Sequence, residues 1–293
     1  MTSPTTASAT PEFVYEDAFS RNLGWVTVAE QARLRGARVA IAGMGGVGGE
    51  HLLTLTRLGI GAFRIADFDH FEVHNFNRQA GAFMSRVGQP KVDVMAEMAQ
   101  DINPEARIER FPEGVTPENV DAFLRDVDVY VDGIDFFAVE ARRMVFAACH
   151  AKGIPAVTAA PLGMGTALLY FSPKGMSFEN YFKLEGQPRQ EQFARFIAGL
   201  SPAMLQFGYL VEPKGISFKE QRGPSTGMSC VLCAGVTGTA VLQLILGRGR
   251  LRAAPWAMHF DAYRQKLSFT WRPFGNAHPL QRMLMRRIRP TLR

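Results

Sequence analysis

The chain has 293 residues, of which 47% are hydrophobic and 20% charged, and its net charge is +6. This composition excludes an intrinsically disordered chain, and three cysteines are too few for a disulfide framework, which indicates a reducing, cytoplasmic location. The positive charge is compatible with a phosphate-bearing or nucleic-acid partner, but charge alone does not identify one.

The sequence predicts one globular domain with a short extension at each end. Residues 1–13 show neither the basic start nor the apolar run of a secretion signal, so we expect a disordered leader there. Residues 14–272 are expected to form a single domain, and the arginine-rich residues 273–293 a solvated basic tail. The longest apolar run, residues 231–247, is interrupted by glycines and polar side chains, so we interpret it as a buried core helix and expect no membrane partner.

Short apolar runs alternate with helix-forming segments over the first 172 residues. A strand begins at Arg38 and ends in glycines, and a helix at residues 49–59 follows it. Further strands are predicted at residues 62–69, 106–111, 127–135, 154–160 and 166–171, and further helices at residues 90–102, 116–125 and 138–153, with Pro90, Thr116 and Gly153 as their terminal signals. This order predicts an α/β fold with a Rossmann-like, mostly parallel sheet and helices on both faces.

The alternation fails between residues 172 and 228. Only one helix, around residues 191–199, is expected in this aromatic and Pro/Gly-rich segment. Because the segment is long for a structureless connection, we interpret it as a crossover or lid insert. The apolar helix that ends at Gly247, with strands at residues 256–263 and 266–273, then predicts a C-terminal antiparallel extension.

The segment "GMGGVG", residues 43–48, lies between a predicted strand and a predicted helix. Glycine lets the backbone turn sharply there and lets a phosphate approach the unpaired amides of the helix N-terminus. Asp67 ends the next strand, which is the usual position of a carboxylate that binds a ribose. The sequence therefore predicts a nucleotide site with five members: Gly43, Gly45, Gly46, Gly48 and Asp67.

The loop "DFDHFEVHNFNRQ", residues 67–79, carries more charge and more amides than a dinucleotide cofactor requires. Its further candidate ligands are Asp69, Asn75, Asn77, Arg78 and Gln79, and Lys91 follows in the next helix. Two cations beside a nucleotide suit a triphosphate, whose negative charge must be neutralised. Asp135, at the end of the strand "VDGID", is then available to hold Mg²⁺.

Each cation also has an ordinary structural explanation. Arg78 could form a surface ion pair with Asp69 or Glu72, and Lys91 could be a solvated residue in the first turn of its helix. Their common position at the carboxyl edge of one sheet favours a functional interpretation. A NAD-dependent oxidoreductase is the weakest interpretation, because no histidine or lysine stands in a dehydrogenase context.

Five motifs stand in one order along the chain: "GMGGVGG", "GIGAFRIADFDHFEVHNFNRQ", "VGQPKVDVM", "INPEARI" and "DVYVDGID". In this order they resemble the ThiF/MoeB/HesA family, which includes the adenylating domain of ubiquitin-activating enzymes. The resemblance covers residues 19–171 and resumes at "GVTGTAVLQLILG" and "HFDAYRQKLSF". It implies an activity in which ATP and a protein's C-terminal carboxylate, usually after Gly-Gly, form an acyl-adenylate and pyrophosphate.

The resemblance also implies roles for individual residues. It gives ribose binding to Asp67, and it brings Gly46 and Asn75 close to the nucleotide. Its phosphate-binding residues are Arg78, Gln79 and Lys91, and its magnesium ligand is Asp135. The segment "SRNLGW" resembles the family's N-terminal arginine segment, so Arg21 is expected to reach the phosphates of a partner subunit in a homodimer.

The chain departs from the family pattern in three respects. The cysteine pairs that hold a structural zinc in many members are absent from their usual places, and the single pair Cys230 and Cys233 lies elsewhere, so we expect no metal besides Mg²⁺. Either of these cysteines could be a thiol nucleophile, or both could pack a helix entrance as small buried residues. The family's asparagine after the magnesium aspartate is Phe136 here, and its nearby arginine is Glu140.

The leading functional hypothesis is an ATP-dependent adenylyltransferase of the ubiquitin-like modifier activating type. Its substrate would be the C-terminus of a ubiquitin-like or sulfur-carrier protein, or of a peptide. A close alternative is the dehydratase that cyclises threonylcarbamoyladenosine in tRNA, for which the basic C-terminus would suit tRNA. A nucleotide-binding regulatory protein without turnover is a third possibility, suggested by Phe136 and Glu140.

Overall fold

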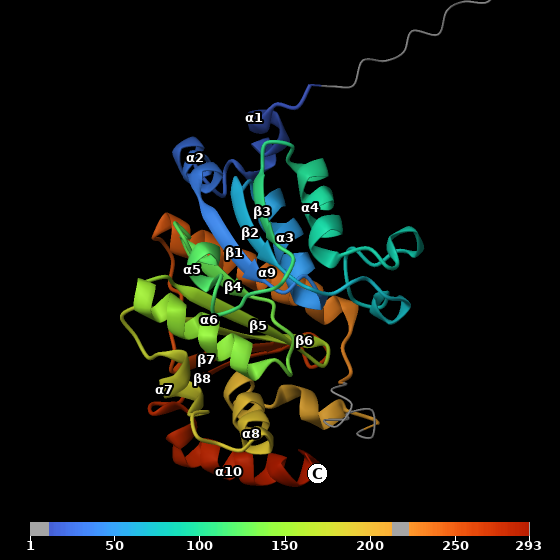
Figure 1. Ribbon diagram of the computed structural model, residues 1–293. Coiled ribbons are helices and arrows are strands. Elements are labelled where there is room, and N and C mark those ends of the chain that lie inside the picture. The colour runs from blue at the N-terminus through green and yellow to red at the C-terminus, as the bar shows by residue number, and fades with distance from the viewer. Residues whose placement is uncertain (1–11, 213–222, 293) are drawn as a thin grey trace, which may run out of the picture.

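The structure is a computed structural model, and it describes residues 12–212 and 223–292. Eight strands form one sheet in the order β3-β2-β1-β4-β5-β6-β7-β8 (Figure 1). The strands are β1 (Arg38–Ala42), β2 (Ala62–Ala66), β3 (Arg107–Phe111), β4 (Val129–Asp132), β5 (Ala156–Leu162), β6 (Gly165–Phe171), β7 (Trp256–Asp261) and β8 (Lys266–Trp271). Strands β1 to β5 are parallel, and β6, β7 and β8 extend the sheet in antiparallel pairs. The predicted mostly parallel sheet with an antiparallel C-terminal extension is confirmed.

The helices follow the predicted alternation in the first half of the chain. They are α1 (Tyr15–Ala18), α2 (Val28–Gly36), α3 (Gly46–Arg57), α4 (Lys91–Ile102), α5 (Val120–Phe123), α6 (Val139–Lys152), α7 (Phe178–Phe182), α8 (Arg189–Leu200), α9 (Gly227–Leu246) and α10 (Pro279–Ile288). Pro90 is the N-cap of α4, and Gly153 ends α6 with φ of 72°. The predicted start at Thr116 is wrong, because the Asn119 side chain accepts the Thr116 N–H (2.8 Å) in a turn and α5 begins only at Val120.

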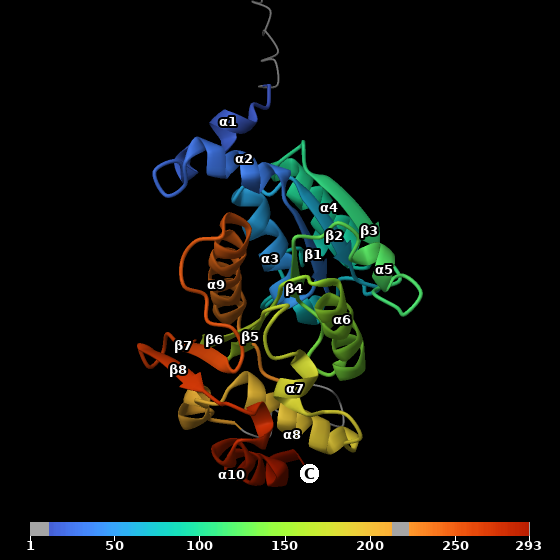
Figure 2. The ribbon, with the colours of Figure 1, turned by 90° about the vertical axis from the view of Figure 1, so that its left-hand side faces the viewer.

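Helices cover both faces of the sheet, and the alternation of side chains along each strand explains how. In β1, Val39 and Ile41 belong to the core cluster that contains residues of α3, α4 and α9, whereas Ala40 and Ala42 belong to the cluster that contains residues of α5 and α6. Figure 2 shows the sheet between α3 and α9 on one side and α5 and α6 on the other. The side chains of β1 from Val39 to Ala42 are nearly inaccessible to solvent.

The segment from residue 172 to residue 228 holds more regular structure than the sequence predicts. It contains α7, α8 and a 3₁₀ helix, η4 (Leu205–Tyr209), before α9 begins. Aromatic side chains explain the additional order: the Phe178 ring packs against Phe146 of α6 (centroids 4.5 Å apart) and against Phe182 (4.5 Å). We call α7, α8, η4 and α10 the crossover lobe, and it lies at the lower end of the molecule in Figure 1.

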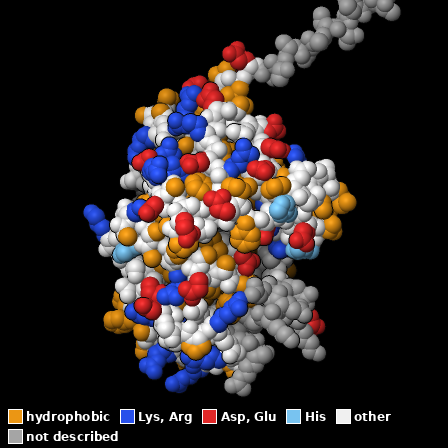
Figure 3. All heavy atoms as spheres, viewed as in Figure 1, with side chains coloured by type: hydrophobic (Ala, Val, Ile, Leu, Met, Phe, Trp, Pro, Cys, Tyr) orange, Lys and Arg blue, Asp and Glu red, His pale blue; other side chains and the backbone are white. Residues whose placement is uncertain are grey.

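The prediction of a solvated tail at residues 273–293 is wrong for the part that the structure describes. Residues 279–288 form α10, whose buried side chains Gln281, Met285 and Ile288 recur at helical spacing. Arg289 forms two hydrogen bonds of 2.8 Å with Glu191 of α8. The tail was predicted from its number of arginines, and this composition does not reveal the buried apolar face of α10. The basic side chains lie on the solvent-facing side of the helix, where Figure 3 shows Lys and Arg side chains.

Helix α9 is long and apolar enough to cross a membrane, with a mean hydropathy of 1.9. Its surroundings indicate a core helix instead. It packs along α3 and across β5 and β6, and its buried side chains include Cys233, Val241 and Leu246. The prediction of a buried helix at residues 231–247 therefore agrees with the structure.

His51 of α3 predicts a pH dependence of stability. The ring is completely buried, neither nitrogen has a hydrogen-bond partner among the described residues, and burial lowers its pKa from 6.5 to about 3. Because the unfolded chain binds this proton more readily, the contribution of neutral His51 is complete above pH 6.5 and is lost as the pH falls towards 3.

We expect the free energy of unfolding to fall between pH 7 and pH 5, with about 2 kcal/mol of the fall due to His51. Urea denaturation at both pH values, with wild type and His51→Leu, measures the difference. Parallel pH profiles for the two proteins would contradict the assignment.

Candidate functional site

The glycine turn joins the carboxyl end of β1 to the first turn of α3. Gly43 has φ of 89°, and its N–H donates to the carbonyl of Ala66 at the end of β2 (2.7 Å). A Cβ on Gly43 would collide with the carbonyl oxygen of Gly133 in the loop after β4, so only glycine permits this contact. Gly45 is the N-cap of α3 and offers no side chain to its first amides. These amides are therefore available to an anion at the carboxyl edge of the sheet.

Asp67 follows β2 and is hydrogen-bonded to the glycine turn. Its Oδ2 accepts the N–H of Met44 (2.5 Å), and its Oδ1 accepts the N–H of Asp69 (2.8 Å). Burial raises the pKa of the Asp67 carboxyl, while the two amides and the nearby Lys91 counteract the rise. The carboxylate thus lies beside the glycine turn.

Arg78 and Gln79 border the same turn. A Cβ on Gly46 would lie 3.6 Å from Cγ of Arg78, and a Cβ on Gly45 would lie 3.7 Å from Nε2 of Gln79. Arg78 Nη1 donates to the carbonyl of His74 (3.0 Å) and to Oδ1 of Asn77 (2.8 Å), and not to the acidic side chains of its own loop. Gln79 is buried, and its Oε1 has no partner in the described part of the chain. A buried acceptor without a partner suggests that a ligand supplies the donor.

The two asparagines of the loop hold its shape. The buried Asn75 accepts the N–H of Glu72 through Oδ1 (2.9 Å) across the 3₁₀ helix η2 (Val73–Asn75). Asn77 donates from Nδ2 to the carbonyl of Ser225 just before α9 (2.9 Å). Both side chains therefore have structural contacts that the nucleotide role predicted for them does not require.

Lys91 is the first residue of α4, and it is not the solvated lysine of the alternative explanation. Its side chain is only 8% exposed, and its Nζ lies 3.1 Å from Oδ2 of Asp69, whose own side chain is 55% exposed. The N–H of Lys91 also donates to the carbonyl of Asp69 (2.9 Å). The ammonium group is therefore held at the carboxyl edge of the sheet.

Asp135 lies three residues beyond the end of β4, in the loop that leads to α6. It is exposed, and its Oδ1 accepts the N–H of Phe137 (2.9 Å). A single accessible carboxylate is typical of magnesium sites, in which phosphates and waters complete the coordination. Among residues 12–212 and 223–292 there is no cluster of three or more His, Cys, Asp or Glu that could hold a metal by itself. Asp135 thus fits a magnesium ion that a nucleotide helps to bind.

A buried ion pair that was not predicted from the sequence lies next to this loop. Arg142 of α6 donates from Nε to Oδ2 of Asp132 (2.8 Å), and from Nη2 to the carbonyl of Ile134. Thr158 of β5 donates to the same Asp132 oxygen (2.8 Å). The only sequence signal was the presence of Asp132 in "VDGID" and of Arg142 in "EARR".

The two candidate thiols have different positions. Cys230, in the first turn of α9, lies so close to the glycine turn that a Cβ on Gly46 would be 3.1 Å from its Sγ. Cys233 is fully buried and lies 3.2 Å from the hydroxyl of Thr166. Burial raises the pKa of both thiols, which favours packing over a nucleophilic role for either cysteine.

Arg21 does not join the other candidate residues within one chain. It is exposed in the 3₁₀ helix η1 (Ser20–Asn22), whose Asn22 donates to the carbonyl of Leu58 (3.2 Å) at the C-terminal end of α3. The glycine turn lies at the N-terminal end of this helix, about 18 Å away by helical rise. Arg21 can therefore act at such a site only on another subunit.

Replacing Gly46 with alanine is expected to weaken ATP binding about tenfold or more, with a change in stability of no more than about 1 kcal/mol. The new methyl group would lie against Sγ of Cys230 and occupy the space between the turn and the Arg78 stem, where a phosphate would approach. Isothermal titration calorimetry with ATP measures the effect. Gly36→Ala, which meets nothing within 4 Å, is the control, and equal ATP affinities for the two variants would contradict the prediction.

The arrangement supplies an anion-binding helix N-terminus, two cations and an exposed carboxylate along one sheet edge. The ThiF family model matches residues 19–282. The chain belongs to the ThiF family. This finding confirms the resemblance to the ThiF/MoeB/HesA family that the motifs indicate.

Two curated relatives illustrate the range within the family. The tRNA threonylcarbamoyladenosine dehydratase of Escherichia coli (strain K12) is 39% identical over 128 residues, which are 43% of this chain and 47% of that protein. The probable adenylyltransferase/sulfurtransferase MoeZ of Mycobacterium tuberculosis is 29% identical over 222 residues, which are 75% of this chain and 50% of that protein. The chain thus spans about half the length of the curated relatives it matches.

A solved structure supports the fold. The E. coli tRNA N6-threonylcarbamoyladenosine dehydratase in complex with AMP superimposes with a TM-score of 0.60, at 22% identity, over 82% of this chain and 98% of that one. At this identity the likeness concerns the fold alone.

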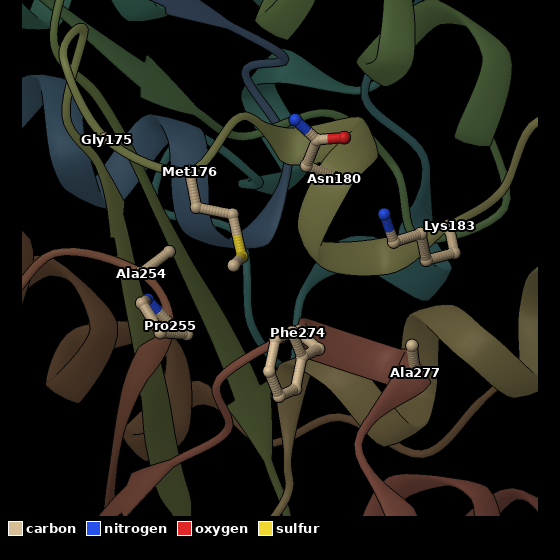
Figure 4. Close-up of a pocket in the computed structure, with 8 residues that line it drawn as sticks. All are labelled: Gly175, Met176, Asn180, Lys183, Ala254, Pro255, Phe274 and Ala277. Atoms are coloured by element: carbon tan, nitrogen blue, oxygen red, sulfur yellow. The ribbon is translucent and has the colours of Figure 1, made fainter.

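A separate recess of about 780 Å³ lies between α7, the start of β7 and the 3₁₀ helix η6 (Gly275–Ala277) (Figure 4). Its walls are mostly apolar and include Met176, Pro255 and Phe274, and Asn180 and Lys183 add polar side chains to the lining. None of the predicted site residues lines it. We therefore assign the candidate site to the glycine turn, where the charged groups converge, and not to this recess.

Proposed function

We propose that this protein is an ATP-dependent adenylyltransferase of the ubiquitin-like modifier activating type. In the proposed reaction a carboxylate oxygen attacks the α-phosphorus of ATP, the bond to the bridging oxygen breaks, and pyrophosphate leaves with that electron pair. The product is an acyl-adenylate. The substrate that we favour is the C-terminus of a small ubiquitin-like or sulfur-carrier protein or of a peptide, in keeping with the name of a Thermus thermophilus relative, "sulfur carrier protein adenylyltransferase".

The observation that carries this proposal is the convergence of the glycine turn with two cations. The Arg78 stem borders Gly46, and Lys91 is held at the same sheet edge by Asp69. Bound ATP supplies the reacting phosphorus and the leaving group. The attack needs in-line placement and neutralisation of developing charge more than it needs a general base, and these groups can provide both.

Each residue of the site has a specific task in this proposal. The first amides of α3, with Arg78 and Lys91, bind the phosphates. Gln79 was expected to bind them too, but its buried Oε1, unpaired within the described ranges, is an acceptor like the phosphate oxygens, so in this proposal it accepts a hydrogen bond from a hydroxyl or amino group of the nucleotide. Asp67 orients the ribose, and Asp135 binds the magnesium ion that accompanies the nucleotide.

A homodimer is part of the proposal, because Arg21 can complete the site only across subunits. Hydrophobic residues near Arg21 are unusually exposed: Trp25 is 84% and Val28 73% exposed. The loop after β2 also presents Phe68 at 72% and Met84 at 73% exposure. Such surfaces suit burial against a second copy of the chain. Analytical ultracentrifugation at several protein concentrations measures the oligomeric state. A monomer with full activity would exclude a role for Arg21 at the site of a second subunit.

ATP–pyrophosphate exchange with a panel of small Gly-Gly-ended proteins and peptides tests the proposed reaction. A carboxylate that supports exchange in wild type, but not in Arg78→Ala or Asp135→Ala, supports it. An exchange rate that is unchanged in both variants would contradict the proposed roles of Arg78 and Asp135. ATP binding without exchange across the panel would instead favour a regulatory protein. Phe136 and Glu140, which replace the family's asparagine and arginine, are the reason to measure binding and exchange separately.

A tRNA threonylcarbamoyladenosine dehydratase is the second candidate. Relatives of that name are the observation in its favour, and α10 offers a suitable surface with Arg282, Arg286 and Arg287 exposed and without ion-pair partners in the described regions. Phosphate contacts release counterions, so specific tRNA binding should weaken steeply with salt. Conversion of threonylcarbamoyladenosine in tRNA, without exchange on any protein carboxylate, would select this candidate.

A further inference from the structure

The loop that carries Asp135 is held from two sides by one side chain. Arg142 binds its start through Asp132 and its middle through the carbonyl of Ile134. The face of the same guanidinium lies 4.7 Å from the centroid of the Phe196 ring in α8. Arg142 therefore connects the sheet, the Asp135 loop and the crossover lobe.

The aromatic residues after Asp135 extend this connection. Phe136 packs against Phe196 (centroids 5.3 Å apart) and Phe193 (6.3 Å) of α8. Gln192 of α8 also donates to Glu140 at the start of α6 (3.0 Å). The positions at which the family has an asparagine and an arginine thus bind α8 in this chain.

Arg142 is not a displaced copy of the family's arginine. Positions 140 and 142 differ by about 200° around a helix, so they point in nearly opposite directions. Glu140 is exposed, whereas Arg142 is 4% exposed. The guanidinium lies behind the loop, and it can act on a ligand only by holding Asp135 in place.

The energetics of the pair favour a positioning role over a purely stabilising one. A buried ion pair often contributes little net stability compared with apolar side chains of the same volume. In addition, Nη1 of Arg142 is buried without a hydrogen-bond partner in the described part of the chain, which has an energetic cost. What Arg142 provides is a fixed geometry for Asp132 and Ile134, both of which precede Asp135 in the chain.

We propose that Arg142 is the positioning residue of the Asp135 loop, and that through Phe196 it couples magnesium binding at Asp135 to the crossover lobe. This inference rests on the proposed function, because it takes Asp135 as the residue that binds Mg²⁺ beside ATP. The interaction of Arg142 with Asp132 fixes the loop. Because Arg142 also contacts Phe196, the position of the loop depends on the position of α8.

The test is the effect of MgCl₂ on ATP affinity, measured by calorimetry as the ratio of the dissociation constants without and with the ion. We expect Asp135→Asn and Arg142→Lys each to lower this ratio about tenfold, with the affinity for ATP alone changed less than about threefold. Lysine keeps the charge but cannot make both hydrogen bonds and the ring contact. Phe196→Leu keeps the ion pair and is expected to lower the ratio about threefold. If Arg142→Lys does not fold, this variant still measures the coupling between α8 and magnesium binding.

Arg143→Lys is the matched control, because the neighbouring Arg143 pairs with Glu140 and Glu179 and not with the Asp135 loop. Its ratio should equal that of wild type. A purely structural role would lower the melting temperatures of Arg142→Lys and Phe196→Leu but leave their ratios at the wild-type value, and this result would overturn the positioning role. Wild type that does not bind ATP would instead overturn the proposed function.

Discussion

Replacing Lys91 with methionine is expected to lower the rate of ATP–pyrophosphate exchange by about 10²–10³-fold, which corresponds to a loss of about 3–4 kcal/mol of transition-state stabilisation. The ammonium group is nearly buried and held by Asp69, so it is already ordered where negative charge would develop. A preorganised charge of this kind needs no reorganisation during the reaction.

The change in stability should be small by comparison, because the Asp69 side chain is 55% exposed and can be hydrated once its partner is lost. Lys152→Met is the control, since Lys152 also pairs with an exposed aspartate, Asp121 (2.8 Å), but lies at the end of α6. A Lys91→Met rate within threefold of the control would show that this cation does not take part in the reaction.

Gly48→Ala is expected to destabilise the protein by about 3 kcal/mol and to abolish measurable ATP binding. A Cβ at this position would collide with the carbonyl oxygen of Gly43, which is backbone and cannot rotate away. The glycine turn and the first turn of α3 would have to separate, and the amides of α3 would lose the arrangement that an anion needs.

Gly235→Ala separates this steric effect from helix propensity. Gly235 also lies within a helix, but a Cβ there meets nothing within 4 Å, so alanine should stabilise α9 by about 0.5–1 kcal/mol. Chemical denaturation of both variants gives the comparison. Two changes of the same sign would mean that the contact between Gly48 and Gly43 does not determine the shape of the turn.

The parts of the fold that the sequence predicts are those with a local pattern. Strand β1 is a short apolar run followed by glycines, and Gly153 ends α6 as predicted, in the left-handed conformation. The glycine turn was recognisable for the same reason, since its spacing between a strand and a helix is a property of adjacent residues.

The errors arose where a pattern was weak or was judged by composition. The arginines of residues 279–288 suggested a solvated tail, but the stripe of Gln281, Met285 and Ile288 gives α10 a buried face. In the same way, the crossover lobe is ordered by aromatic contacts such as that of Phe178 with Phe146. Those partners are remote in sequence, and no local spacing indicates them.

The sequence by itself determined the order of the elements, the membership of the ThiF family and the identity of the residues around the glycine turn, because each depends on neighbours along the chain. Only the tertiary structure decided that Arg142 supports the Asp135 loop, that Cys230 packs on Gly46 and that Arg21 lies away from its own chain's site. These relations join segments that meet only when the sheet closes against its helices, and burial in that packed state sets which groups are paired and which remain available to a ligand.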